Sequence, residues 1–158
     1  MSLDRFTDGR AEGSRNQEYL PLLAETLQKL PYHRSMGMKI EEYGDGHCLI
    51  RVAVSENILS PFGAVHGGIL YSLCDVAAAI ATFTRLAIDY LPVTADINVS
   101  ILTAVSEGEL DIKAKVLKMG KRSCFIDSRA MQGQELVAVA RVTKTIIAFP
   151  RMKTILGL

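Results

Sequence analysis

Several features that mark other classes of protein are missing from this sequence. Eighteen Lys and Arg residues against seventeen Asp and Glu leave a formal net charge of +1, so no overall field attracts nucleic acid or an anionic membrane. The cysteines are Cys48, Cys74 and Cys124. They form no CxxC pair and their number is odd, which argues against both a disulfide framework and a zinc site. This cysteine usage indicates a reducing compartment, and we expect a cytoplasmic protein.

Motifs for phosphate, dinucleotide or metal chemistry are also absent. The chain contains no Walker loop, no GxGxxG and no HExxH, so we expect neither a metal nor a redox cofactor. The polar start of the chain lacks the apolar region of a signal peptide. The apolar stretch after Gly67 is too short for a membrane span and has Asp75 at its centre.

The length of 158 residues predicts a single domain over residues 1–158. We expect a loose tail at 1–15, a short helix within 16–31 and the core of the domain at 33–148. Apolar residues recur at helical spacing between Tyr19 and Leu30, with Pro21 in the first turn. Pro31 is expected to end this helix.

The sequence of the core predicts several strands around one long helix. An extended segment is expected at 36–46, and alternating or β-branched patterns predict strands near residues 48–54, 93–102, 109–118, 122–131 and 135–148. Short turns at 119–121 and 132–134 join the last three strands into an antiparallel meander. A single apolar helix at 67–84 lies among the strands. We therefore predict an α+β fold in which a curved antiparallel sheet of five or six strands wraps around this helix.

The helix at 67–84 contains an isolated carboxylate. Asp75 is the only acidic residue between Gly63 and Phe83, and a buried charge without a partner costs several kcal/mol. The neighbours of Asp75 on its helical stripe are small: Gly68, Ser72, Ala79 and Thr82. A second, apolar stripe is expected to face the sheet: Ile69, Leu73, Val76, Ile80 and Phe83. Asp75 is then either a structural acid bonded to a backbone group or hydroxyl, or a catalytic one.

The residues His66-Gly67-Gly68 open this helix. The first N–H groups of a helix have no internal partner and lie at its positive end, so the Gly67 N–H is a candidate oxyanion donor. Asp75 lies eight residues further on, which at the rise of an α-helix is about 12 Å. That distance is too long for both groups to act on one carbonyl. If both are catalytic, Asp75 must act with Gly67 of a second copy of the chain.

The pattern Gly63-x-x-His66-Gly67-Gly68 followed by Asp75, on the helix of a β-α-β-β-β-β chain, resembles the hotdog-fold acyl-CoA thioesterases. Within them it is similar to the PaaI-like branch, related to phenylacetic acid degradation and 4-hydroxybenzoyl-CoA hydrolysis, over residues 33–148. The resemblance implies hydrolysis of an acyl-CoA at the interface of a homodimer, which is often paired further into a tetramer. It implies that Asp75 is the general base or nucleophile and that the Gly67 amide polarises the thioester carbonyl.

The resemblance also implies roles for polar residues nearby. Thr94 matches a residue that helps to orient the attacking water. Ser60 stands where the family usually has Asn or Gln, with Asn57 three residues further back. His66 has no Ser or Cys nucleophile placed beside it, and we expect it to fix the loop by a hydrogen bond. Gly68 and Ser72 are expected to border the substrate.

Coenzyme A carries phosphates, and the densest basic group brackets the turn at 119–121. It consists of Lys118, Lys121 and Arg122, which either contact these phosphates or form a solvated hairpin tip. Two other functions remain open: a hotdog dehydratase or hydratase that uses a histidine and an acid, and an acyl-CoA-binding domain without turnover. The sequence also leaves open whether the acyl group is aryl or aliphatic.

Overall fold

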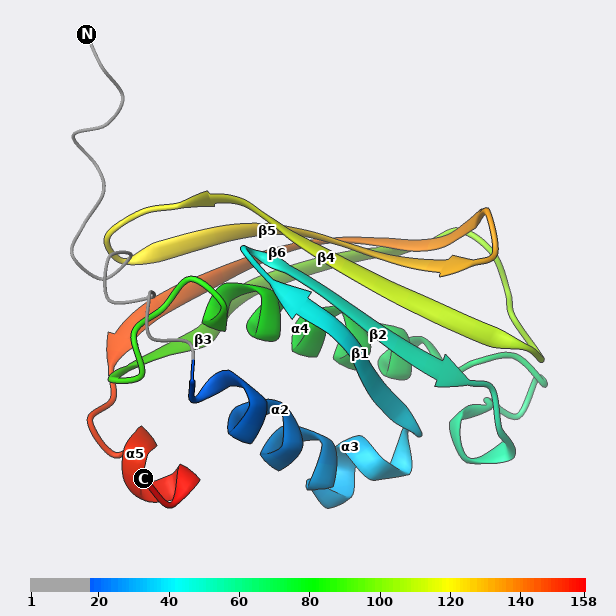
Figure 1. Cartoon of the computed structure of the whole chain (residues 1–158). Helices are drawn as coiled ribbons and strands as arrows, with labels where there is room; N and C mark the ends of the chain where they lie inside the picture. Colours follow the sequence, from blue (N-terminus) through cyan, green and yellow to red (C-terminus); the bar gives the residue numbers. More distant parts are fainter. Residues whose placement is uncertain (1–17) are drawn as a thin grey trace, which may run out of the picture.

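The computed structural model describes residues 18–158, so the tail predicted at 1–15 lies outside the described residues. One six-stranded sheet wraps around a long central helix (Figure 1). The helices are α2 (Leu20–Lys29), α3 (Pro31–Ser35), η3 (Glu56–Ile58), α4 (Gly67–Phe83) and α5 (Met152–Leu156). The strands are β1 (Met38–Gly44), β2 (His47–Ala53), β3 (Tyr90–Ile101), β4 (Glu109–Met119), β5 (Ser123–Gln132) and β6 (Glu135–Ala148). The predicted hotdog architecture is confirmed.

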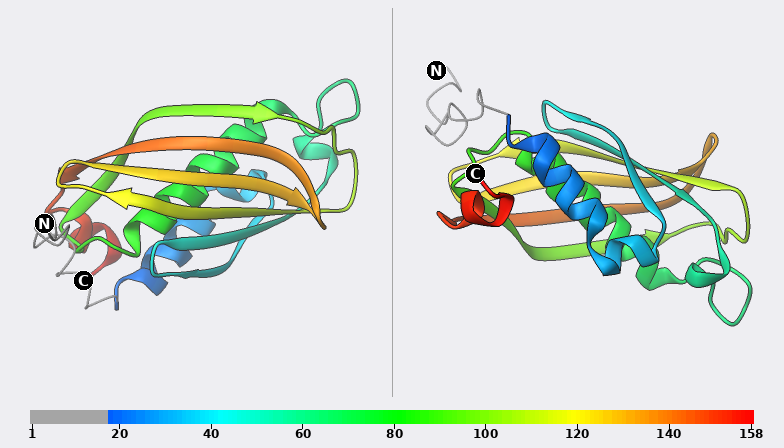
Figure 2. Two further views of the ribbon diagram at one scale, coloured as in Figure 1. Left: turned by 90° about the horizontal axis from the view of Figure 1, so that it is seen from above. Right: turned by 60° about the horizontal axis from the view of Figure 1, so that its bottom comes forward.

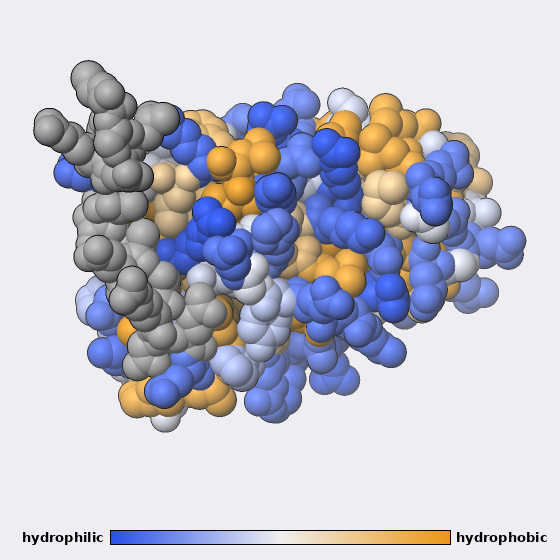
Figure 3. Space-filling view, turned by 45° about the horizontal axis from the view of Figure 1, so that its top comes forward, coloured by the Kyte–Doolittle hydropathy of each residue, from blue (hydrophilic) through white to orange (hydrophobic). Residues whose placement is uncertain are grey.

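The strands follow the order β1-β2-β4-β5-β6-β3, and every neighbouring pair is antiparallel. The predicted meander of β4, β5 and β6 forms the middle of the sheet, and the strands cross over α4 (Figure 2). The outer face of the sheet is mostly hydrophilic (Figure 3) and carries ion pairs such as Arg51–Asp111. β3 is an edge strand, and among residues 18–158 it pairs only with β6. Its other edge is therefore left open.

The face that α4 turns to the sheet differs from the predicted one. The fully buried apolar residues are Leu73, Cys74, Ala77, Ala78 and Ala81, whose directions are centred about 110° from the expected stripe. Ile69 and Val76 of that stripe are only partly buried, and Phe83 packs in a separate cluster near α2 and α5. The prediction was wrong because α4 is apolar on two sides.

The N-terminal helix packs beneath the C-terminal end of α4. Tyr19, Leu20 and Leu23 pack with Phe83 and Met152 of α5 in this second cluster. The first helix ends before Pro31 as expected, because Leu30 leaves the helical conformation at ψ 134°. Pro31 then begins a second short helix, α3, which was not predicted. α5 was not predicted. No helix within residues 18–158 is long and apolar enough to cross a membrane.

Tyr19 links this second apolar cluster to the C-terminal end of α4 by hydrogen bonds. Its buried hydroxyl contacts the carbonyl oxygens of Phe83 at 3.0 Å and Leu86 at 2.9 Å, and burial raises the pKa of Tyr19. The hydroxyl therefore stays protonated and donates to these oxygens.

We expect Tyr19→Phe to lower the free energy of unfolding by about 1–3 kcal/mol, because two buried carbonyl oxygens lose their donor. Urea denaturation followed by circular dichroism measures the change. Tyr43→Phe is the matched control, since Tyr43 is partly exposed. An equal loss of stability in the two variants would contradict this role of Tyr19.

Candidate active site

Asp75 lies midway along α4, on the side that faces β3 and β6. The Thr94 hydroxyl lies 2.9 Å from each of the two Asp75 carboxylate oxygens. The Nζ of Lys144 donates to Asp75 Oδ1 at 2.8 Å and to Thr94 Oγ1 at 2.6 Å. The Asp75 side chain nevertheless keeps 32% of its surface exposed. The carboxylate is thus fixed from one side and reachable from the other.

Lys144 is the residue of this cluster that the sequence analysis missed. Only 1% of its surface is exposed. On β6 it occupies an inward position in the buried series Ala140, Val142, Lys144 and Ile146, and this alternation was the available signal. Burial lowers the pKa of Lys144, while the hydrogen bond and charge of Asp75 act in the opposite direction. Asp75 therefore has a charged partner within its own chain.

Thr94 reaches the carboxylate because of its register in the sheet. It lies directly across from Lys144 in the β3–β6 ladder, so both side chains are on the face that meets α4. A bulge between Thr94 and Asp96 follows at once. Bulges re-aim side chains locally and often occur near functional sites. Thr94, which was expected to orient the attacking water, therefore lies beside Asp75.

The start of α4 is capped by a side chain. His66 is the N-cap residue, and its Nδ1 accepts a hydrogen bond from the Gly68 N–H at 3.0 Å. Nδ1 must then be unprotonated, which places the proton of the neutral ring on Nε2. No described residue accepts a hydrogen bond from the Gly67 N–H. Of the two glycines, Gly67 therefore has the available donor.

Ser60 and Asn57 lie in the loop that precedes α4. The Ser60 N–H donates to Ala64 O at 2.7 Å, and the Phe62 N–H donates to the Ser60 hydroxyl oxygen at 3.3 Å. These bonds close a turn beside the segment that carries His66. Asn57 is exposed within η3. Both residues lie on the approach to the α4 N-terminus, and neither contacts Asp75 in these bonds.

Ser72 lies one turn before Asp75 on the partly exposed face of α4. Its hydroxyl donates to Gly68 O at 2.8 Å and contacts the Tyr32 hydroxyl of α3. Cys74 is fully buried, and burial raises the pKa of its thiol to about 11. Cys74 is therefore a core thiol at neutral pH and not a nucleophile.

Lys118, Lys121 and Arg122 lie at the end of the sheet opposite to Gly67. The nearby Val116 N–H donates to Gly46 O, and the Gly46 N–H donates to Thr84 at the C-terminus of α4. All three basic side chains are exposed and none forms an ion pair with a described residue. Within one chain, these three basic side chains therefore do not lie near the Gly67 N–H.

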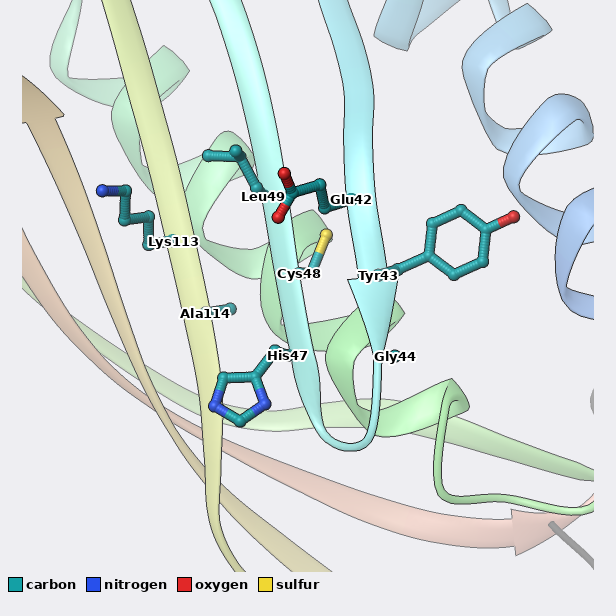
Figure 4. A pocket seen from close by; sticks show the side chains of 8 residues that line it. All are labelled: Glu42, Tyr43, Gly44, His47, Cys48, Leu49, Lys113 and Ala114. Carbon is teal, nitrogen blue, oxygen red and sulfur yellow. The ribbon is translucent and has the colours of Figure 1, made fainter. Parts of the chain in front are cut away.

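A hollow of about 480 Å³ lies elsewhere, between β1, β2 and β4 (Figure 4). Its lining includes Glu42, His47, Leu49 and Lys113. None of the predicted site residues lines it. The candidate site is therefore the exposed side of Asp75 together with the α4 N-terminus.

Comparison with known proteins gives consistent results. The family profile described as the thioesterase superfamily matches residues 62–139. The 1,4-dihydroxy-2-naphthoyl-CoA hydrolase of Listeria monocytogenes is 24% identical over 110 residues, which is 69% of this chain and 89% of that protein.

Two solved structures share the architecture. A conserved protein of Pseudomonas aeruginosa aligns with a TM-score of 0.75 and 29% identity, over 78% of this chain and 99% of that one. A thioesterase of Haemophilus influenzae aligns with a TM-score of 0.75 and 23% identity, over 82% and 90% of the two chains. The matched segment contains Gly67, Asp75 and Thr94. With the fold, these matches show that the chain is similar to proteins of the thioesterase superfamily.

Proposed function

We propose that this protein hydrolyses acyl-CoA thioesters to a free acid and CoA. Asp75 acts as general base or nucleophile, and the Gly67 N–H of a partner subunit stabilises the oxyanion. The observation that carries the proposal is the state of Asp75: its carboxylate is held by Thr94 and Lys144 on one side and exposed on the other. A carboxylate in this state can meet a substrate without rearranging.

The second half of the site is the N-terminus of α4. The Gly67 N–H is at the positive end of a 17-residue helix and has no described acceptor, as an oxyanion donor requires. Gly67 and Asp75 belong to one α-helix, so the rise per residue fixes their separation at about 12 Å. Joining them at one thioester requires a second copy of the chain.

The open edge of β3 supports a homodimer. β3 is 12 residues long, and β6 is its only partner strand in the described part of the chain. Val93, Ile101 and Leu102, on or next to this strand, are exposed large apolar residues. Edge pairing of two copies about a two-fold axis would extend the sheet and place the two α4 helices side by side. Each Gly67 could then approach the other chain's Asp75, and pairs of dimers could form a tetramer.

The geometry of His66 disfavours a dehydratase or hydratase. Those reactions need a histidine that takes a proton from carbon. Because Nδ1 of His66 accepts from Gly68, the remaining Nε2 carries the proton of the neutral ring and is a donor. With the cap intact His66 cannot be the base, which leaves Asp75 as the basic group.

The proposal is tested by incubating the protein with aryl- and aliphatic acyl-CoAs and following free CoA with a thiol reagent. We expect CoA release, and the rates across the panel identify the acyl group. Retention of acyl-CoA without turnover would indicate a binding domain. An altered acyl chain without free CoA would indicate a hydratase.

We expect Asp75→Asn to lower kcat by about 10²–10⁴-fold, the contribution of a positioned base. The amide keeps an oxygen that can accept from Lys144, so the contact at the buried ammonium is retained. Asp96→Asn is the control, because Asp96 is exposed on the same strand as Thr94. If the folded Asp75→Asn variant hydrolysed the substrate at the wild-type rate, Asp75 would have no catalytic role.

The shared site predicts complementation between two inactive variants. Gly67→Pro removes the proposed oxyanion donor, and proline suits the first position of a helix. His66 before it is already extended, with ψ 133°, as a residue preceding proline must be. A side chain at Gly67 would meet only the flexible Ile101 Cδ1, at 3.1 Å.

We expect a mixed dimer of Asp75→Asn and Gly67→Pro chains to regain one intact site, since each chain supplies what the other lacks. The two variants are refolded together, mixed dimers are verified by native mass spectrometry, and CoA release is measured. If the two groups acted within one chain, no intact site would form. Mixed dimers that remain as inactive as either parent would therefore refute the cross-subunit site.

A further inference from the structure

The proposed mechanism assigns no part in the reaction to the buried cation that contacts Asp75. Lys144 is among the largest fully buried side chains of the described residues. Removing an ammonium from water costs several kcal/mol, and one ion pair seldom returns more than that. Apolar residues such as Val142 and Ile146 fill the neighbouring inward positions of β6. Packing alone therefore does not explain a lysine at this position.

The two ends of the ion pair lie in different surroundings. The Lys144 side chain is 2% exposed, whereas that of Asp75 is 32% exposed. The cross-strand ion pair Arg51–Asp111, by contrast, has side chains that are 40% and 27% exposed. Lys144 thus contacts the carboxylate from inside the protein, opposite to the side from which a substrate arrives.

The two carboxylate oxygens of Asp75 have different hydrogen-bond donors. Lys144 donates to Oδ1 and to the Thr94 hydroxyl oxygen. Because Thr94 Oγ1 accepts from Lys144, its single proton is directed to the carboxylate. Oδ1 is held by a charged donor, while Oδ2 has only the shared Thr94 proton. Oδ2 is left with the greater free capacity to accept a proton or to attack.

We propose that Lys144 is a positioning residue for the reaction of Asp75. Its ammonium holds Oδ1 directly and through Thr94, and this contact presents Oδ2 to the bound thioester. The inference rests on the proposed thioesterase function. Lys144 lies beyond residues 62–139, the segment that matches the superfamily profile, so this role comes from the geometry of this chain.

Lys144→Met tests the proposal, because methionine keeps an unbranched side chain of similar size and removes the charge. We expect kcat to fall by about 10²-fold, the effect of misplacing a reacting group by about 1 Å, with KM little changed. Arg51→Met is the matched control, since it breaks an ion pair between β2 and β4 that is remote from the site. The control is expected to keep the wild-type kcat.

A double variant separates positioning from a general loss of structure. If Lys144 acts through Asp75, adding Lys144→Met to Asp75→Asn lowers kcat no further. A purely structural lysine would lower kcat in both backgrounds by the same factor. Equal factors, or a wild-type kcat in Lys144→Met, would overturn the inference.

Rescue by a small cation provides a second readout. Lys144→Ala leaves space for n-propylammonium, which we expect to restore part of kcat in proportion to its concentration, whereas n-propanol restores none. Refolding Lys144→Ala with the amine also keeps the proposal testable if Lys144→Met does not fold. Folded protein that stays inactive with the amine, or that propanol rescues equally, would count against a positioning charge. A wild-type protein that releases no CoA would instead refute the thioesterase function itself.

Discussion

The contact between Lys144 and Asp75 fixes how the central helix sits on its sheet. Lys144 has no exposed route to water, so its ammonium depends on the oxygens of Asp75 and Thr94. Rotating α4 by one residue would turn Asp75 by about 100° and leave a buried cation without its counter-ion. This contact joins α4, β3 and β6, the three elements that meet at the candidate site. The same contact therefore fixes both the rotation of α4 about its axis and the geometry of the candidate site.

The small residues of the core allow this contact. α4 turns Ala77, Ala78 and Ala81 toward the sheet, and all three are fully buried. The inward residues of the sheet include further alanines: Ala114, Ala130, Ala138 and Ala140. Short side chains on both surfaces let helix and sheet approach closely, so that the short carboxylate of an aspartate reaches a residue on β6. The alanines thus contribute to the site although none is polar.

The parts of the fold that depend on local patterns were predictable, and those that depend on long-range contacts were not. The alternation of β4 and β6 and the apolar run of α4 gave their bounds nearly to the residue. The face of α4 was assigned wrongly because the sheet and the cluster around Phe83 cover two different apolar sides. Lys144 was missed because its partner Asp75 lies 69 residues away in sequence. Strand alternation marks an inward position but cannot identify the counter-ion that makes a lysine acceptable there.

In the proposed dimer, each chain contributes a half-site that is already formed. The acidic half, with Asp75, Thr94 and Lys144, is complete within one chain. The oxyanion half is held by the His66 cap, which leaves the Gly67 N–H free of described partners. What one rigid helix cannot provide is their proximity. Pairing of two chains along β3 would supply this proximity without ordering any side chain anew. The orientation that catalysis requires would then be established when each chain folds, before the substrate binds.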